Sequence, residues 1–164
     1  MKVCNAFTKP FSGTGFFNKS FPAYGDTGTG YNRATSALMN LAIVGTYPST
    51  SLHYPLILIS KGPLPSAENA PAVINIDNNI LFSWADNTGT GTAKANDKVI
   101  LIAYFPVLKQ IIYSLQSATR ADCQAVLETN KMHGYTAETW VGFLSCDEND
   151  AANSVYAGSV VIST

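Results

Sequence analysis

Alternating apolar positions in the middle of the chain predict two strands of a buried β-sheet. Ile80, Phe82 and Trp84 fall on one face at a period of two residues. The run from Val99 to Phe105 is apolar or aromatic at every position, the pattern of a strand covered on both faces. A polar loop from Asp86 to Asp97 joins the two segments. This order is typical of the middle of a β-sandwich, with Trp84 as a pillar of its core.

Further segments bring the expected number of strands to about seven. They comprise residues 72–76, 110–115, 122–127, 138–146 and 154–162, and turn residues separate them. The last two flank an acidic turn and are expected to form a terminal hairpin. The chain is therefore predicted to be mainly β, with an immunoglobulin-like or fibronectin type III-like sandwich over residues 72–164.

One short helix is expected ahead of the sandwich, over residues 31–44. Ala34, Leu38 and Leu41 share a face at helical spacing. Thr29 is placed to cap the first turn with its hydroxyl. The apolar face of this helix is expected to pack on the core of the protein.

The chain divides into three expected parts. Residues 1–30 form a Phe- and Gly-rich arm, residues 31–71 a helix-and-strand extension packed on the sandwich, and residues 72–164 the sandwich itself. Within the extension, residues 56–60 form a short, fully apolar run that predicts another strand.

The amino-terminal arm holds five of the eight phenylalanines, namely Phe7, Phe11, Phe16, Phe17 and Phe21. The glycines and prolines between them argue against a long helix or a regular strand. The aromatic rings argue against a solvated tail, because such tails are poor in aromatics. We therefore expect an irregular arm that buries its rings. They either pack on the chain's own sandwich or bind a neighbouring subunit as partner-binding residues.

Composition narrows the classes of partner. Charged residues make up 13% of the chain, against roughly 25% in an average soluble domain. Such a weakly charged surface is typical of proteins that lie against other subunits, and also of extracellular β domains. Ten basic and eleven acidic residues give no electrostatic case for nucleic acid. No apolar run approaches the roughly 20 residues of a membrane span.

The first residues lack the apolar core of a signal peptide. We therefore expect synthesis in the cytoplasm, with any release occurring as part of an assembly. Cys4, Cys123 and Cys146 are an odd set without metal-site spacing, and three free thiols are the simplest interpretation. Cys123 is expected inside a strand, and a Cys123–Cys146 bridge remains an alternative.

The sequence contains no motif that indicates catalysis. A nucleophile elbow, a glycine-rich phosphate loop and a zinc-protease motif are all missing. His53 and His133 are the only histidines, and neither has a nearby carboxylate or cysteine at ligand spacing. Asp147, Glu148 and Asp150 supply the oxygen ligands that calcium prefers, but a solvated turn is the simpler interpretation. We expect no enzymatic activity, no cofactor and no metal.

Several short motifs occur in the order found in an uncharacterised bacterial domain family. They are Tyr31–Ser36, Gly45–Pro48, Ile59–Leu64, Phe82–Trp84, Asp97–Val99 and Ser154–Gly158. On these motifs, residues 25–164 resemble that family, whose function is unknown, with an abbreviated amino-terminal region. The resemblance implies no reaction, cofactor or catalytic residue. Residues 72–164 also resemble a fibronectin type III-like sandwich, a likeness that carries no function by itself.

Together these features predict a non-enzymatic structural or interaction protein. It would self-assemble with copies of itself or with other protein subunits through the sandwich faces and the arm. A component of a virion or of another extracellular assembly is one concrete form. The alternative is a sandwich module that binds carbohydrate or another ligand by stacking Tyr135, Trp140 and Tyr156 on a sugar ring. For these three side chains, packing in the core is the competing interpretation.

Overall fold

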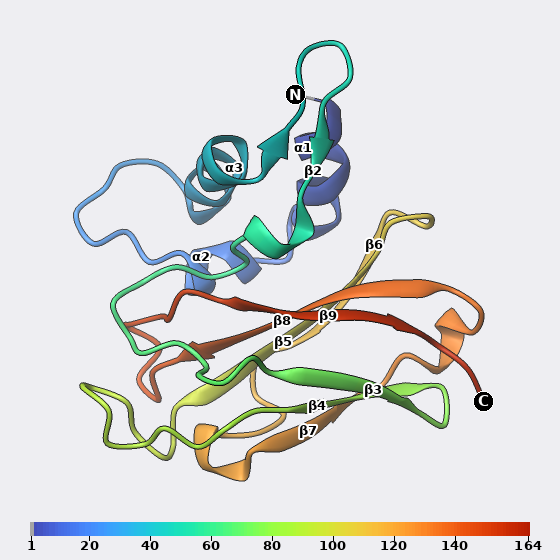
Figure 1. The fold of residues 1–164 in the computed structure, drawn as a ribbon. Helices are drawn as coiled ribbons and strands as arrows, with labels where there is room; N and C mark the ends of the chain where they lie inside the picture. Colours follow the sequence, from blue (N-terminus) through green and yellow to red (C-terminus); the bar gives the residue numbers. More distant parts are fainter. Residues whose placement is uncertain (1) are drawn as a thin grey trace.

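A three-stranded sheet, a four-stranded sheet and a layer of short helices are stacked in that order (Figure 1). The computed structural model describes residues 2–164, apart from the side chain of Asn130. Within these residues the two sheets contain β3 (Ala72–Ile76), β4 (Asn79–Ser83), β5 (Lys98–Phe105), β6 (Gln110–Ser114), β7 (Gln124–Leu127), β8 (Thr136–Leu144) and β9 (Val155–Val161). The strand orders are β3–β4–β7 and β6–β5–β8–β9, with all neighbours antiparallel. The expectation of a mainly β fold is confirmed.

The helical layer spans residues 2–56 and covers the four-stranded sheet (Figure 1). It comprises α1 (Lys2–Thr8), the 3₁₀ turn η1 (Lys9–Phe11), α2 (Phe16–Ser20), α3 (Gly30–Leu41), the short strands β1 (Ile43–Val44) and β2 (Ser51–Leu52), and the 3₁₀ turn η2 (Tyr54–Leu56). The prediction of an irregular arm is therefore wrong for residues 2–20, which fold largely into short helices, whereas residues 21–29 form a loop without helix or strand. Gly13 and Gly15 lie between these helices with positive φ, so they shorten the helices without preventing them.

Strand β5 is buried on both faces, as its apolar pattern predicts. Leu101 and Phe105 point into a sandwich core between the two sheets. Ile100 and Ile102 point the other way, into a cap core shared with the helical layer. The four-stranded sheet is thus the common wall of two cores.

The extension differs from its prediction at two points. The expected helix over residues 31–44 ends at Leu41 and is followed by β1, and the expected strand over residues 56–60 is absent. Helix α3 begins as expected, since the Thr29 hydroxyl accepts a hydrogen bond from the Asn32 N–H at 3.2 Å. The apolar run at residues 56–60 is not a strand of either sheet. After η2 it crosses the molecule as an extended segment, and the Ile59 N–H donates to the Ser154 hydroxyl at 2.9 Å. A short apolar run has the same periodicity in a strand and in a buried crossing, which explains the error.

Trp84 lies just beyond β4 in the sandwich core, 6% exposed. Its indole N–H donates to the Arg120 carbonyl at 2.8 Å, and its ring packs on Phe143. The carbonyl belongs to η3 (Arg120–Asp122), which includes Asp122, the first residue expected in β7. Cys123 is therefore not inside a strand, but caps η3 in a left-handed conformation with φ 61°.

Candidate functional site

An uncovered apolar row crosses the three-stranded sheet. Ile74, Leu81 and Val126 are direct cross-strand neighbours, so their side chains lie side by side on one face. Ile74 is 57% and Val126 47% exposed, whereas Leu81 is half-buried between them. The helical layer lies on the far side of the other sheet and leaves this face open (Figure 1).

The whole face, called here the outer sheet face, carries no charged side chain at its strand positions. These positions are Ala72, Ile74, Ile76, Asn79, Leu81, Ser83, Gln124 and Val126. Period-two alternation produces the face, since the intervening Ile80 and Phe82 fill the sandwich core. Clustered exposed apolar side chains are informative, because monomeric proteins expose few contiguous apolar patches and these often have a function.

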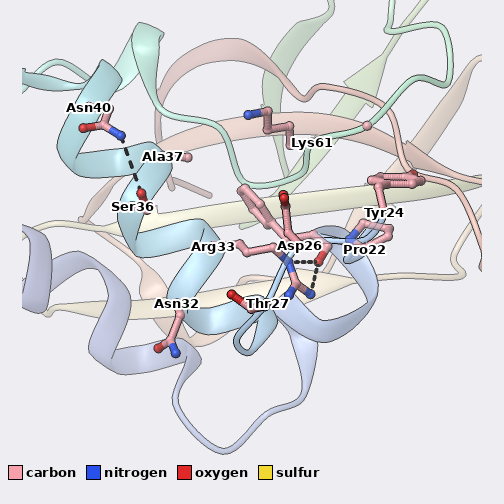
Figure 2. A pocket seen from close by; sticks show the side chains of 12 residues that line it. Pro22, Tyr24, Asp26, Thr27, Asn32, Arg33, Ser36, Ala37, Asn40 and Lys61 are labelled. Atoms are coloured by element: carbon pink, nitrogen blue, oxygen red, sulfur yellow. Dashed lines mark hydrogen bonds between the residues drawn. The ribbon is translucent and has the colours of Figure 1, made fainter.

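A groove of about 440 Å³ lies between α3 and the loop that precedes it (Figure 2). Asn32, Ser36 and Asn40 follow one another along α3 at successive turns and form one wall. The opposite side comes from the loop after α2 and from Lys61 and Gly62. We call this feature the α3 groove.

Arg33 braces the loop that forms this groove. Its Nε and Nη2 donate to the Phe21 carbonyl at 3.0 and 2.7 Å (Figure 2), and its Nη1 donates to the Gly28 carbonyl at 2.8 Å. The guanidinium thereby ties both ends of the loop to α3. These hydrogen bonds hold a segment that forms no helix or strand and whose glycines would otherwise make it flexible.

Tyr24 stands at the rim of the α3 groove in an unusual backbone conformation. Its φ is 45°, in the left-handed region that few non-glycine residues adopt, and the residue is 52% exposed. Its hydroxyl accepts a hydrogen bond from the Ala151 N–H at 3.1 Å. Burial of this hydroxyl raises the pKa of Tyr24, the bond from Ala151 lowers it, and nearby Asp150 raises it again.

Gly62 is required where the Tyr24 hydroxyl docks. A Cβ on Gly62 would lie 2.7 Å from the Tyr24 hydroxyl and 2.1 Å from the Ala151 carbonyl oxygen. Both separations are shorter than van der Waals contact, so any side chain here would displace the tyrosine. The ring of Tyr24 is thus held by a contact between segments far apart in the chain.

The chain matches the model of a known protein family over most of its length. Residues 2–158 match the model of a family described as "Family of unknown function (DUF6266)". The chain belongs to this family. The DUF6266 match starts at residue 2. It therefore includes the amino-terminal arm, most of which precedes residues 25–164, the range of the resemblance seen in the sequence. No protein of curated function matches the chain. Among the residues that the structure describes, no helix is long and apolar enough to cross a membrane.

The five arm phenylalanines of this DUF6266 chain lie inside its own cap core. Phe7, Phe11, Phe16, Phe17 and Phe21 are each only 1–3% exposed. The Phe7 ring packs edge-on against Tyr104 at 4.8 Å between centroids, and Phe16 packs against Tyr113 at 5.1 Å. Rings buried in this way offer no surface to a neighbouring subunit. The structure thus corrects the partner-binding interpretation and supports the alternative, in which the arm packs on its own chain.

The aromatic residues expected to stack on a sugar do not form an open platform. Trp140 is fully buried and packs on Phe7 and Tyr156. Tyr156 is half-buried, and its hydroxyl donates to the Glu138 carboxylate. Burial and that carboxylate raise the pKa of Tyr156. The competing interpretation of core packing therefore holds for Trp140, and the predicted sugar platform is wrong at this position.

The acidic turn is engaged in protein contacts. Glu148 bridges Lys19 at 2.9 Å and Lys98 at 2.8 Å, and these hydrogen bonds lower its pKa to about 2. Asp147 accepts hydrogen bonds from Ser145 and Asn149, which lower its pKa as well. Among the described residues, no group of three His, Cys, Asp or Glu side chains is arranged to hold a metal ion.

The remaining candidates for chemistry are not among the residues that form the outer sheet face or line the α3 groove. His53 and His133 are exposed, and His133 Nδ1 lies 2.9 Å from the amide oxygen of Asn78. All three cysteines are free thiols. Cys4 is buried in the cap core, where burial raises the pKa of its thiol.

Proposed function

We propose that this chain is a non-enzymatic interaction domain that self-associates through its outer sheet face. The observation that supports this function is the exposed row of Ile74, Leu81 and Val126 on a sheet that no described helix covers. Burying these side chains against another surface is favourable at roughly 25 cal/mol per Å² of apolar area. The buried arm phenylalanines take no part in this association.

A second copy of the chain is the partner that best suits this face. The strand positions of the outer sheet face carry no charge, so two copies meet without like-charge repulsion. A two-fold axis through the row would place each Leu81 near its symmetry mate, giving an isologous contact. The low overall charge of 13% adds little long-range repulsion between copies.

The size of the face sets the strength of the association. Three strands about 4.8 Å apart and five residues of about 3.4 Å each define an area of roughly 250 Å². A standard stable interface buries about 800 Å² per partner. Association through this face alone should therefore be weak, and should matter where many copies are held close together, as in an extracellular or virion assembly.

The strand order supports a fibronectin type III-like version of the sandwich. The first, second and fifth of the seven sandwich strands form one sheet, and the fourth lies beside the third in the other. In the constant immunoglobulin arrangement the fourth strand lies beside the fifth instead. Sandwich domains of this kind serve in many interaction proteins, so the proposed fold agrees with the proposed function by analogy alone.

Sedimentation analysis of the full chain over a wide concentration range tests the proposal. We expect a concentration-dependent rise above the monomer mass of 17.5 kDa. The double variant Ile74→Lys/Val126→Lys should abolish this rise, because it places charges in the apolar row. Val107→Lys is the matched control, since Val107 is 79% exposed in the turn between β5 and β6. A chain that stays monomeric at every concentration, or a control that weakens association equally, would contradict the proposal.

A further inference from the structure

We propose that the α3 groove binds a short carbohydrate, with the ring of Tyr24 as its stacking platform. This inference is independent of self-association, because the groove lies in the helical layer and the outer sheet face on the opposite side of the molecule (Figure 1). It also replaces the aromatic set expected from the sequence, in which Trp140 is buried.

The first support is the way Tyr24 is held. Its ring stays half-exposed while its hydroxyl is anchored on the Ala151 N–H. A ring fixed in the free protein loses little conformational freedom when a ligand packs on it. Tyrosine also presents a large, flat apolar surface suited to the C–H face of a sugar. The left-handed backbone at Tyr24 is costly, and such strain gathers at ligand sites.

The second support is the polar wall on α3. Asn32, Ser36 and Asn40 offer amide and hydroxyl groups at successive turns along the groove (Figure 2). Amides and hydroxyls both donate and accept hydrogen bonds, as sugar hydroxyls do. The one contact between these side chains is long, 3.5 Å from Asn40 Nδ2 to the Ser36 hydroxyl. Their hydrogen-bonding capacity is thus largely free for a ligand.

The charges in the groove favour a neutral ligand over a multiply charged anion. Arg33 and Lys61 contribute positive charge, and Asp26 contributes a carboxylate between them (Figure 2). Among the described residues, none of these three side chains forms an ion pair. A phosphate-rich ligand would meet the Asp26 carboxylate, and an apolar ligand would leave the polar groups unpaired. A polyhydroxylated ligand satisfies groups of both signs.

The volume of the groove sets the size of the ligand and its affinity. About 440 Å³ lies within the usual range for small-molecule sites, which suits a short oligosaccharide. The groove lies on the surface and leaves one side of the ligand in water. We therefore expect a dissociation constant on the order of 1 mM.

Binding is tested first by adding a broad panel of short oligosaccharides, each at millimolar concentration, to the full ¹⁵N-labelled chain. The oligosaccharide that binds best is then titrated into ¹⁵N-labelled protein. Saturable shifts are expected at the backbone amides of residues 23–27 and 32–40. Absence of binding to every glycan, or shifts confined to other residues, would overturn the proposal. So would tighter binding of inorganic pyrophosphate at the same amides, because the groove would then be an anion site.

Two variants and a matched control locate the ligand. Tyr24→Ala should weaken binding at least tenfold, and Asn40→Ala severalfold. Tyr47→Ala is the control, since Tyr47 is 93% exposed and does not line the groove. Thermal melts check that each variant folds. If Tyr24→Ala does not fold, Asn40→Ala alone tests the site. Unchanged affinity in a folded Tyr24→Ala variant, or in Asn40→Ala when Tyr24→Ala fails to fold, would overturn the assignment.

Discussion

Arg120 and Asp97 form an ion pair inside the molecule, 3.0 Å from Nε to Oδ2, with both side chains fully buried. The same guanidinium donates to the Asn87 side chain and to the Pro65 carbonyl, and lies 3.8 Å from the centre of the Phe143 ring. Burial lowers the pKa of Arg120, and Asp97 acts in the opposite direction. The pair joins the long polar loop after Trp84 to the sandwich core.

Removing one partner of this pair should be far more damaging than removing a surface charge. Asp97→Asn leaves the buried guanidinium without its counter-charge, and we expect a loss of about 3–5 kcal/mol in the free energy of unfolding. Asp26→Asn, at an exposed acid, should change stability by less than about 0.5 kcal/mol. Urea denaturation measures both. A loss under about 1 kcal/mol for Asp97→Asn would show that the pair is not essential to the core.

The arm should behave as part of the core. Phe11 is 2% exposed, so Phe11→Ala should cost about 3–5 kcal/mol, the usual range for truncating a buried aromatic ring. Thermal and urea melts measure the loss, with the exposed Tyr47→Ala as the control. Unchanged stability combined with loss of an oligomer would instead indicate that the arm binds a neighbouring subunit.

Glu148 should make stability sensitive to acid. Its pKa is about 2 in the folded chain and near 4.5 when unfolded, so its contribution is present above pH 4.5 and is lost as the pH falls toward 2. The Glu148 side chain is 26% exposed, and its two ion pairs should together contribute about 1 kcal/mol. Glu148→Gln should therefore be less stable than the parent chain by that amount at pH 6, and the difference should shrink steadily as the pH falls from 4.5 through 2. Since salt screens such pairs, the difference at pH 6 should shrink in 1 M NaCl. A difference that does not shrink between pH 4.5 and pH 2 would point to packing as its cause.

Strand periodicity predicts most of the fold, because alternation of apolar and polar residues can be read from neighbouring positions in the sequence. Ile80 and Phe82 alternate into the sandwich core, and the uniformly apolar β5 is buried on both faces, as expected. The prediction failed where the apolar pattern of a segment does not reveal its role in the tertiary structure. The run at residues 56–60 is apolar because it crosses a core and not because it is a strand. Cys123 follows a 3₁₀ turn that the neighbouring residues do not predict.

The candidate sites were harder to predict, since they depend on contacts between distant segments. Tyr24 lies in a glycine-rich loop without periodicity, and its anchor is the Ala151 N–H, 127 residues along the chain. The α3 groove likewise needs Lys61 and Gly62 opposite the helix. The outer sheet face is the exception, because outward positions follow directly once the strands and their register are known. What the sequence lacked there was evidence that no helix covers them.

The wall shared by the two cores has a consequence for how the chain folds. Neighbouring residues of β5, such as Ile100 and Leu101, belong to different cores, so the strand cannot settle in one core without taking its place in the other. The helical layer and the sandwich should accordingly unfold in a single transition rather than one after the other. A fragment cut at residue 72 would expose the cap-core face of the four-stranded sheet, including Trp140 and Ile102. Such a fragment should aggregate, and the smallest stable unit of this protein should include its first helices.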